Sequence, residues 1–154
     1  MLSSVQILER KGVSYRLIEL SDRALSVQDV IRFSKDDVNI GEICKTIILK
    51  DEDEGRYAFF LAGSDKIDFS KAERSIGKNL KIVTANEVRI VAGVDPGAVC
   101  PLLLTIPVIV DKRVLKLENI NFGSGDHRYG LEIATTDFLK IVSHTVIDIT
   151  KNLI

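Results

Sequence analysis

The amino-acid sequence predicts an α/β or α+β fold built around a mixed β-sheet. Segments with strand-like and helix-like patterns are interspersed along the chain, as in folds where helices flank a sheet. The most strand-like run, 43–48, is largely apolar on both faces, which is typical of a central strand covered on both sides. A length of 154 residues with 45% hydrophobic content suits one domain, 1–154, with a substantial core.

Hydrophobic periodicity and stop signals define the elements of the first half. Val5 and Leu8 share a helical face before Gly12, and Ser26 begins a helix with Val27 and Val30 in its apolar stripe. The expected elements are a helix over 3–11, a strand over 13–20 with Val13, Tyr15 and Leu17 on one face, a helix over 26–34, the strand that contains 43–48, a solvated charged hairpin turn at 51–56, and a strand over 57–62.

Turn chemistry defines the second half in the same way. Asp68 or Ser70 caps a helix that Gly77 ends, and Thr136 caps a later one. The other expected elements are a strand over 81–84, a helix over 86–92, a hairpin of 108–110 with 114–117 around Asp111-Lys112-Arg113, a strand over 131–135 and a last strand over 146–149.

Lys45 is the unusual residue of the central strand. Strand periodicity places it on the same face as Ile43 and Ile47. A lysine among apolar neighbours is costly unless its ammonium reaches a partner or an open cleft. Two interpretations are open: the side chain snorkels outward or pairs with a structural carboxylate, or it is a cationic group at the floor of a ligand pocket.

Two glycine-containing loops are the other candidates for a functional site. Residues 93–101 read Gly-Val-Asp-Pro-Gly-Ala-Val-Cys-Pro, and residues 122–126 read Phe-Gly-Ser-Gly-Asp. Proline fixes φ and glycine leaves backbone N–H groups unshielded, so the first loop is rigid and able to approach a ligand closely. The alternative is that both are plain connecting turns.

The sequence excludes several kinds of chemistry. It contains no P-loop pattern, no dinucleotide-binding G-x-G-x-x-G and no G-x-S-x-G nucleophile elbow. His127, in the second loop, is the one plausible imidazole base, whereas His144 suits a surface position. Cys44 and Cys100 are either thiol nucleophiles or inert packing residues. Without an evident protein nucleophile, such a site binds a carbonyl or phosphate oxygen and orients a water.

Composition also limits the partners and the compartment. The net charge of -1 argues against DNA as a partner and requires any polyanion to meet a local patch, such as the lysines and arginines between 66 and 89. No run approaches the ~18 apolar residues of a membrane span, so we expect a cytoplasmic protein without membrane contact. Two cysteines without CxxC or Cys/His spacing predict neither a disulfide framework nor a metal, and no cofactor is expected.

Four runs resemble the YbaK/prolyl-tRNA synthetase-associated domain family. They are I-C-K-T-I-I-L-K, A-G-V-D-P-G-A-V-C-P, F-G-S-G-D and L-E-I-A-T-T-D-F-L, and their order and spacing match over most of the chain. The resemblance implies a mixed, curved sheet flanked by helices and a trans-acting deacylase that hydrolyses mischarged aminoacyl-tRNA. It implies Cys- or Ala-tRNA(Pro)-like substrates, contact with the acceptor end of the tRNA, an aminoacyl-tRNA synthetase as a partner, and no metal.

The resemblance also implies roles for individual residues. Lys45 matches the family's pocket lysine, which would hold the substrate carbonyl or the phosphate of the terminal adenosine, and Gly97 and Pro101 match the G-x-x-x-P loop that would hold the ester oxygen. The residues expected to contact substrate are Thr46, Ala98, Val99, Cys100, Gly123, Ser124, Gly125 and Asp126. Leu102 and Leu103 replace the Phe-Gly of many members, and Cys100 replaces a frequent serine; these departures bear on amino-acid specificity.

A second hypothesis comes from a different class of function. The same fold would serve as a non-catalytic module that captures an aminoacyl-tRNA end or a nucleotide, or that docks to a synthetase. The near-neutral net charge suits a weak or shared grip on tRNA, and Lys45 favours catalysis because an unused lysine in a cleft is costly.

Overall fold

The computed structural model describes residues 2–151, and its strands form two sheets. The strands are β1 (Tyr15–Glu19), β2 (Cys44–Asp51), β3 (Arg56–Ala62), β4 (Leu80–Ile82), β5 (Val108–Asp111), β6 (Asn119–Gly123), β7 (Tyr129–Ala134) and β8 (Thr145–Ile147). One sheet has the order β1-β7-β6 and is antiparallel. The other has the mixed order β4-β2-β3-β5-β8, with β5 parallel to both β3 and β8. A parallel bridge between Ile43 and Asn121 links the two sheets.

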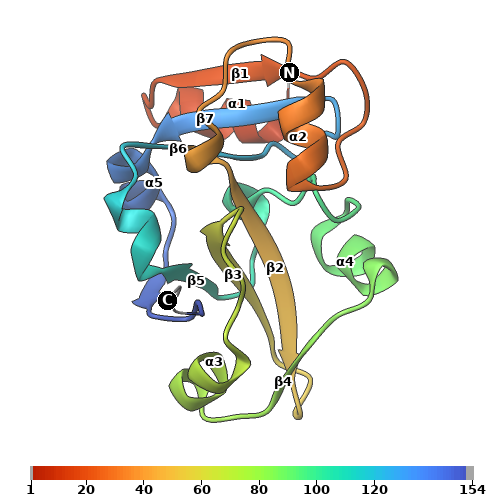
Figure 1. The fold of residues 1–154 in the computed structure, drawn as a ribbon, viewed down its shortest axis with the longest axis vertical. Coiled ribbons are helices and arrows are strands. Elements are labelled where there is room, and N and C mark those ends of the chain that lie inside the picture. Colours follow the sequence, from red (N-terminus) through yellow and green to blue (C-terminus); the bar gives the residue numbers. More distant parts are fainter. Residues whose placement is uncertain (1, 152–154) are drawn as a thin grey trace.

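Helices flank the two sheets (Figure 1). They are α1 (Ser3–Arg10), α2 (Val27–Phe33), α3 (Phe69–Ile76), α4 (Ala85–Ala92) and α5 (Thr135–Ile141), with short 3₁₀ turns η1 (Ile40–Glu42), η2 (Pro101–Leu103) and η3 (Lys112–Lys116). In Figure 1, α1 and α2 accompany the three-stranded sheet, while α3 and α4 lie lower, beside the far end and the flank of β2. Within residues 2–151, no helix has the length and apolar character to cross a bilayer.

The predicted helix ends are confirmed where a side chain or a glycine defines them. Ser26 accepts a hydrogen bond from Asp29 N and begins α2, and Asp68 accepts one from Lys71 N and begins α3. Gly77 ends α3 in the left-handed conformation, with φ of 82°. Each polar cap satisfies a backbone donor at a helix start, which is worth about 1 kcal/mol.

The largest core cluster lies between the two sheets. Phe60 on β3 stacks on Phe138 of α5 with ring centroids 4.8 Å apart, and Phe122 on β6 meets both rings edge-on. All three rings are buried. Because they come from both sheets and a helix, these rings fix how the two sheets sit against each other.

The predicted hairpin over 108–117 is wrong. Val108–Asp111 forms β5, a parallel strand inside the larger sheet, and 112–116 is a 3₁₀ turn instead of a returning strand. Asp111 is a fully buried acceptor, not the start of a solvated turn. Its carboxylate accepts hydrogen bonds from Arg113 N and Ile149 N, and so holds η3 and the C-terminal segment.

Three further expectations needed correction in detail. Helix α5 begins at Thr135 without a side-chain cap, so Thr136 does not cap it. The turn between β2 and β3 is a hairpin as predicted, but Asp51 is buried and accepts hydrogen bonds from Gly55 N and Tyr57 Oη instead of facing solvent. On β1 the fully buried residue is Ile18, whereas Leu17 is exposed.

The 119–123 segment and α2 also differ from the prediction. Residues 119–123 form β6, so the second glycine loop is the connection of a β6–β7 hairpin. The apolar stripe of α2 is not inserted into the core, because none of its residues is buried. This helix therefore lies on the surface, over the cavity described below.

Asp111→Ala tests the role of the buried carboxylate. The change leaves the N–H groups of Arg113 and Ile149 without their acceptor, so we expect a loss of about 2–4 kcal/mol in the free energy of unfolding. Urea denaturation measures it. Asp148→Ala is the matched control, since this half-exposed carboxylate pairs with Lys71 and Lys112 near the surface and should contribute much less. Equal losses for the two variants would contradict the assignment.

Candidate functional site

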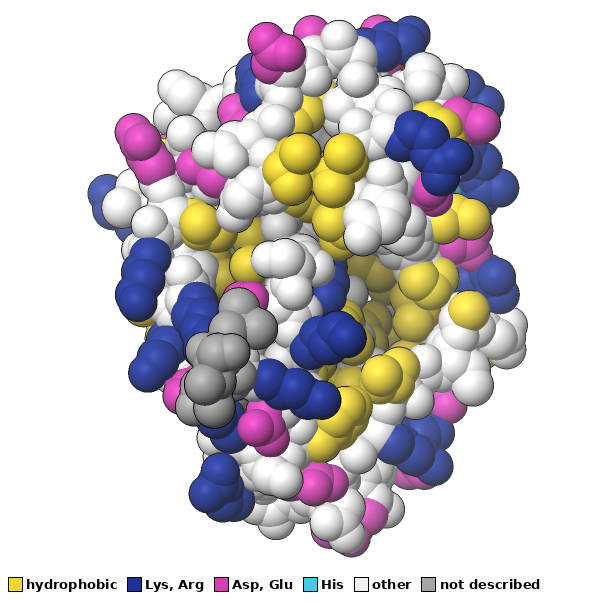
Figure 2. Space-filling view, viewed as in Figure 1, with side chains coloured by type: hydrophobic (Ala, Val, Ile, Leu, Met, Phe, Trp, Pro, Cys, Tyr) yellow, Lys and Arg dark blue, Asp and Glu magenta, His cyan; other side chains and the backbone are white. Residues whose placement is uncertain are grey.

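A cavity of about 380 Å³ lies along an open edge of β2. At one end of this edge, Asn121 of β6 forms a bridge to Ile43, the residue just before β2. At the other end, β4 pairs with β2 from Leu49 to Asp51. Between these two points, in the described part of the chain, no strand covers the edge. Figure 2 shows a hollow with hydrophobic walls here, beside β2 and between the positions that α2 and α4 occupy in Figure 1.

The open edge presents backbone groups to the cavity. Ile48 O accepts a hydrogen bond from Val83 N on the β4 side of the strand. Because strand residues two apart direct their N–H and C=O groups to the same side, Thr46 presents its backbone groups toward the uncovered side. Its side-chain Oγ1 is also buried and has no hydrogen-bond partner among residues 2–151. Thr46 thus offers polar groups that no group in the described part of the chain uses.

Lys45 is half-buried in the wall of this cavity. Its Nζ donates a hydrogen bond to Gly63 O at 3.0 Å, and no ion pair with a carboxylate forms within residues 2–151. Burial lowers the pKa of Lys45, an effect that nearby Asp65 opposes and Lys66 reinforces. The side chain therefore does not extend into solvent, and among the described residues it pairs with no carboxylate, so two of its three N–H groups can serve a ligand.

The two glycine loops touch through their backbones. Gly125 N donates to Ala98 O at 2.9 Å, and a Cβ on Gly123 would lie 2.5 Å from Val99 O. Gly97 has φ of 96°, and a Cβ there would lie 2.6 Å from the backbone carbon of Leu25. Only glycine fits at these contacts, which bring three segments together at the cavity.

An aspartate holds the first loop in place. Asp95 accepts hydrogen bonds from Arg23 and Arg89, and its Oδ2 lies 3.4 Å from Nε2 of His127. The hydrogen bond with Arg89 is the largest contribution that lowers the pKa of Asp95. This carboxylate thereby joins the turn before α2, the end of α4 and the second glycine loop.

His127 is anchored on both ring nitrogens. Its Nδ1 lies 3.0 Å from Ala24 O, and a carbonyl only accepts, so Nδ1 carries a proton. Nε2 then faces Asp95. The imidazole lines the cavity, and when Nε2 is also protonated the ring pairs with Asp95, so these contacts give His127 a structural role in holding the loops.

The two thiols are unsuited to nucleophilic attack. Burial raises the pKa of Cys44 and of Cys100 to about 12. Both side chains belong to the main core cluster, and each is less than 5% exposed. A thiolate is the reactive form of cysteine, so neither residue supplies a nucleophile near neutral pH.

The structure brings about half of the predicted site residues to the cavity. Those that line it are Lys45, Thr46, Gly97, Val99, Gly123 and Asp126. Those that do not are Ala98, Cys100, Pro101, Ser124 and Gly125. Pro101 borders a separate groove beside α1 instead, and the buried Ser124 binds the backbone of its own loop through Oγ. The roles assigned to all these residues stay predictions.

Several lining residues were missed from the sequence. The helix α2 contributes Val27 and Val30, and the buried Asn121 comes from β6. A signal for Asn121 was present, because it interrupts the apolar residues Ile120 and Phe122. No element is predicted from the sequence for 118–121, and the alternation has meaning only once 119–123 is known to be a strand.

The arrangement combines an ammonium, open-edge backbone groups and close-packed glycine loops. Such groups bind a carbonyl or phosphate oxygen and stabilise negative charge that develops on it. In residues 2–151 no cluster of three or more His, Cys, Asp or Glu side chains is placed to hold a metal ion.

Known families and structures provide an independent comparison. A model of the aminoacyl-tRNA editing domain family matches residues 23–141, a range that contains Lys45 and both glycine loops. The hypothetical protein APE2540 has a TM-score of 0.85 at 24% identity, over 97% of this chain and 100% of that one. A protein proposed to be a trans-editing enzyme for prolyl-tRNA synthetase has a TM-score of 0.82 at 24% identity, over 97% and 96% of the two chains. These structural likenesses show a shared fold, and the predicted mixed sheet flanked by helices is confirmed.

Lys45→Met tests whether the buried ammonium is kept at the expense of stability. Burial lowers the pKa of Lys45 below its ordinary value of 10.5, so the folded state releases this proton at a lower pH than the unfolded state does. At pH 7 both states are charged, and burying the charge reduces the free energy of unfolding. We expect the methionine variant to be at least as stable as wild type at pH 7, with a difference that shrinks as the pH rises toward 10.5.

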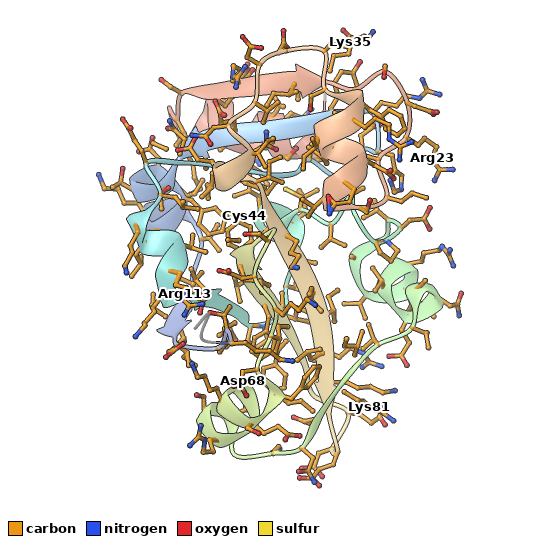
Figure 3. The ribbon with its side chains drawn as sticks, viewed as in Figure 1. Arg23, Lys35, Cys44, Asp68, Lys81 and Arg113 are labelled. Atoms are coloured by element: carbon orange, nitrogen blue, oxygen red, sulfur yellow. The ribbon has the colours of Figure 1, made fainter. Side chains whose placement is uncertain are left out.

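Thermal unfolding between pH 7 and 10.5 measures this difference. Lys81→Met is the control, because Lys81 is exposed on β4 at the far end of the molecule from Cys44 (Figure 3). It should alter stability little at any pH. A Lys45→Met variant that is clearly less stable than wild type at pH 7 would instead show that the ammonium supports the fold.

Proposed function

The chain belongs to the aminoacyl-tRNA editing domain family, and from this premise we propose that it is a trans-acting deacylase that hydrolyses the ester of mischarged tRNA. The observation that carries the proposal is Lys45, a half-buried cation with unused N–H groups in a largely apolar cavity beside two glycine loops. We propose Cys- or Ala-tRNA(Pro)-like substrates, in keeping with the related structure proposed to serve prolyl-tRNA synthetase.

The proposed mechanism places the ester carbonyl beside Lys45. Water attacks the carbonyl carbon, the carbonyl oxygen becomes an oxyanion, and collapse breaks the bond to the ribose oxygen. That oxygen takes a proton and leaves as the tRNA hydroxyl, while the amino acid leaves as a carboxylic acid. The ammonium and backbone N–H groups of Thr46 and of the Gly97 loop stabilise the oxyanion, and losing one such donor costs about 2.7–4 kcal/mol of barrier.

The attacking water is oriented without a protein nucleophile. Cys44 and Cys100 stay protonated near neutral pH because burial raises the pKa of each to about 12, and His127 is occupied by Ala24 and Asp95. Backbone carbonyls at the cavity or a hydroxyl of the terminal ribose therefore position the water in this proposal.

The grip on the rest of the tRNA is weak or shared in this proposal. Arg16, Arg23, Lys50 and Lys71 are each paired with a carboxylate, and the net charge is -1. A synthetase partner would supply part of the affinity for tRNA. We also propose that residues 1–154 act as one editing domain in the cytoplasm, where aminoacyl-tRNA is made and used.

Single-turnover deacylation tests the proposed function. Proline tRNA is charged separately with proline, alanine, cysteine and serine and mixed with excess wild-type protein, Lys45→Ala or Lys81→Ala. We expect wild type and Lys81→Ala to clear at least one mischarged species and spare Pro-tRNA, and Lys45→Ala to be about 100-fold slower or more. Binding of these tRNAs without hydrolysis by wild type would favour the non-catalytic capture module instead, and full turnover by folded Lys45→Ala would remove Lys45 from the mechanism.

Gly97→Ala and Gly93→Ala form a matched pair for the first glycine loop. Both glycines have positive φ, at 96° and 75°, so alanine is strained at each. Only at Gly97 would the new Cβ meet another segment, the backbone of Leu25, whereas Gly93 has no neighbour within 4 Å. We expect Gly97→Ala to reduce single-turnover deacylation at least about tenfold, since about 1 Å of misplacement is enough for such a loss, and Gly93→Ala to retain the rate. Equal rates for the two variants would show that the loop's position does not matter to the reaction.

A further inference from the structure

Asn121 is a buried polar residue with an unused donor. Its side chain is 1% exposed and lines the cavity, and Nδ2 makes no hydrogen bond to any group in residues 2–151. A buried amide without a partner is destabilising, and native structures contain few of them. The residue therefore calls for an explanation beyond packing.

The strand geometry places Asn121 at the junction of the two sheets. On β6, Ile120 and Phe122 point into the main core, and the intervening Asn121 lies on the opposite face. The bridge pairs Asn121 with Ile43, so Asn121 lies beside the start of β2. Ile43 is two residues before Lys45 along the chain. The end of the cavity where the sheets meet thus holds the carboxamide, and Lys45 lies further along the open edge.

Much of the wall of this cavity is apolar. Leu20, Ala24 and Val30 belong to a small hydrophobic cluster, and all three line the same cavity. A solitary amide in an apolar wall discriminates between ligands, because a ligand that pairs with it recovers a hydrogen bond and one that does not leaves it buried and unpaired.

We propose that Asn121 determines specificity by binding the side chain of the substrate amino acid, and that a side chain with a hydroxyl is preferred over the Cys and Ala side chains of the substrate class proposed above. This inference rests on the proposed function, in which the ester lies at Lys45 and the amino-acid side chain extends toward the sheet junction. A hydroxyl both donates and accepts, so it pairs with either end of the carboxamide. A thiol pairs weakly and a methyl group not at all, which gives the order serine, cysteine, alanine.

The test compares seryl and alanyl esters on the same tRNA. Single-turnover rates are measured with wild type, Asn121→Leu, Asn121→Ala and Asn119→Leu. Wild type should clear the seryl ester about 10- to 100-fold faster than the alanyl ester. Both Asn121 variants should lose this ratio through slower seryl clearance. Asn119→Leu should keep it, because Asn119 lies on the same strand and does not line the cavity.

Two further measurements separate specificity from structure and from catalysis. Thermal unfolding should show Asn121→Leu as stable as wild type or more so, since the change removes an unpaired polar group; a strongly destabilised variant would assign Asn121 a structural role instead. Binding of stable 3′-amide analogues, seryl and alanyl aminoadenosine, to wild type tests selectivity without turnover and without any variant.

The outcomes distinguish this inference from the proposed function. Equal clearance of both esters, or a ratio retained in folded Asn121→Leu, overturns the inference and leaves the deacylase standing. No clearance of any ester, with tighter binding of the seryl analogue, overturns the deacylase and supports Asn121 as the selective group of a capture module. Equal binding of the two analogues overturns the inference even if neither Asn121 variant folds.

Discussion

The site depends on incomplete pairing along one edge of β2. The bridge between Ile43 and Asn121 occupies one end of that edge, and β4 occupies the other, from Leu49 onward. The uncovered length between them gives the cavity its floor and directs the backbone of Thr46 toward it. A continuous sheet across this gap would satisfy every backbone group and leave no place for a ligand, so the interruption of the sheet is what makes binding possible.

The remaining walls are held by contacts too close for any side chain. Gly97 lies against Leu25, and Gly123 lies against Val99. Asp95, in the first glycine loop, accepts hydrogen bonds from Arg89 and Arg23. Backbone packing sets the distances and the carboxylate ties the segments together, so the loops are preorganised before a substrate arrives.

Much of the fold and part of the site could be predicted from local chemistry. The caps at Ser26 and Asp68, the buried strand with Lys45 and the glycine loops each leave a signal within a few residues. The predictions that were wrong or missing concern residues whose structure depends on segments distant in the sequence. Residues 108–117 read as a hairpin because an apolar run does not reveal that its neighbour is a parallel strand, and α2 and Asn121 reach the cavity only through tertiary packing.

Phe122 belongs both to the main core and to the wall of the cavity, and this has a consequence for folding. This ring packs with Phe60 and Phe138 in the main core, yet the same residue lines the cavity. The wall that Phe122 forms therefore belongs to the same cooperative unit as the core, whereas α2, which has no buried residue, covers the cavity from the surface. Loss of the aromatic cluster would therefore remove this wall of the cavity together with the core.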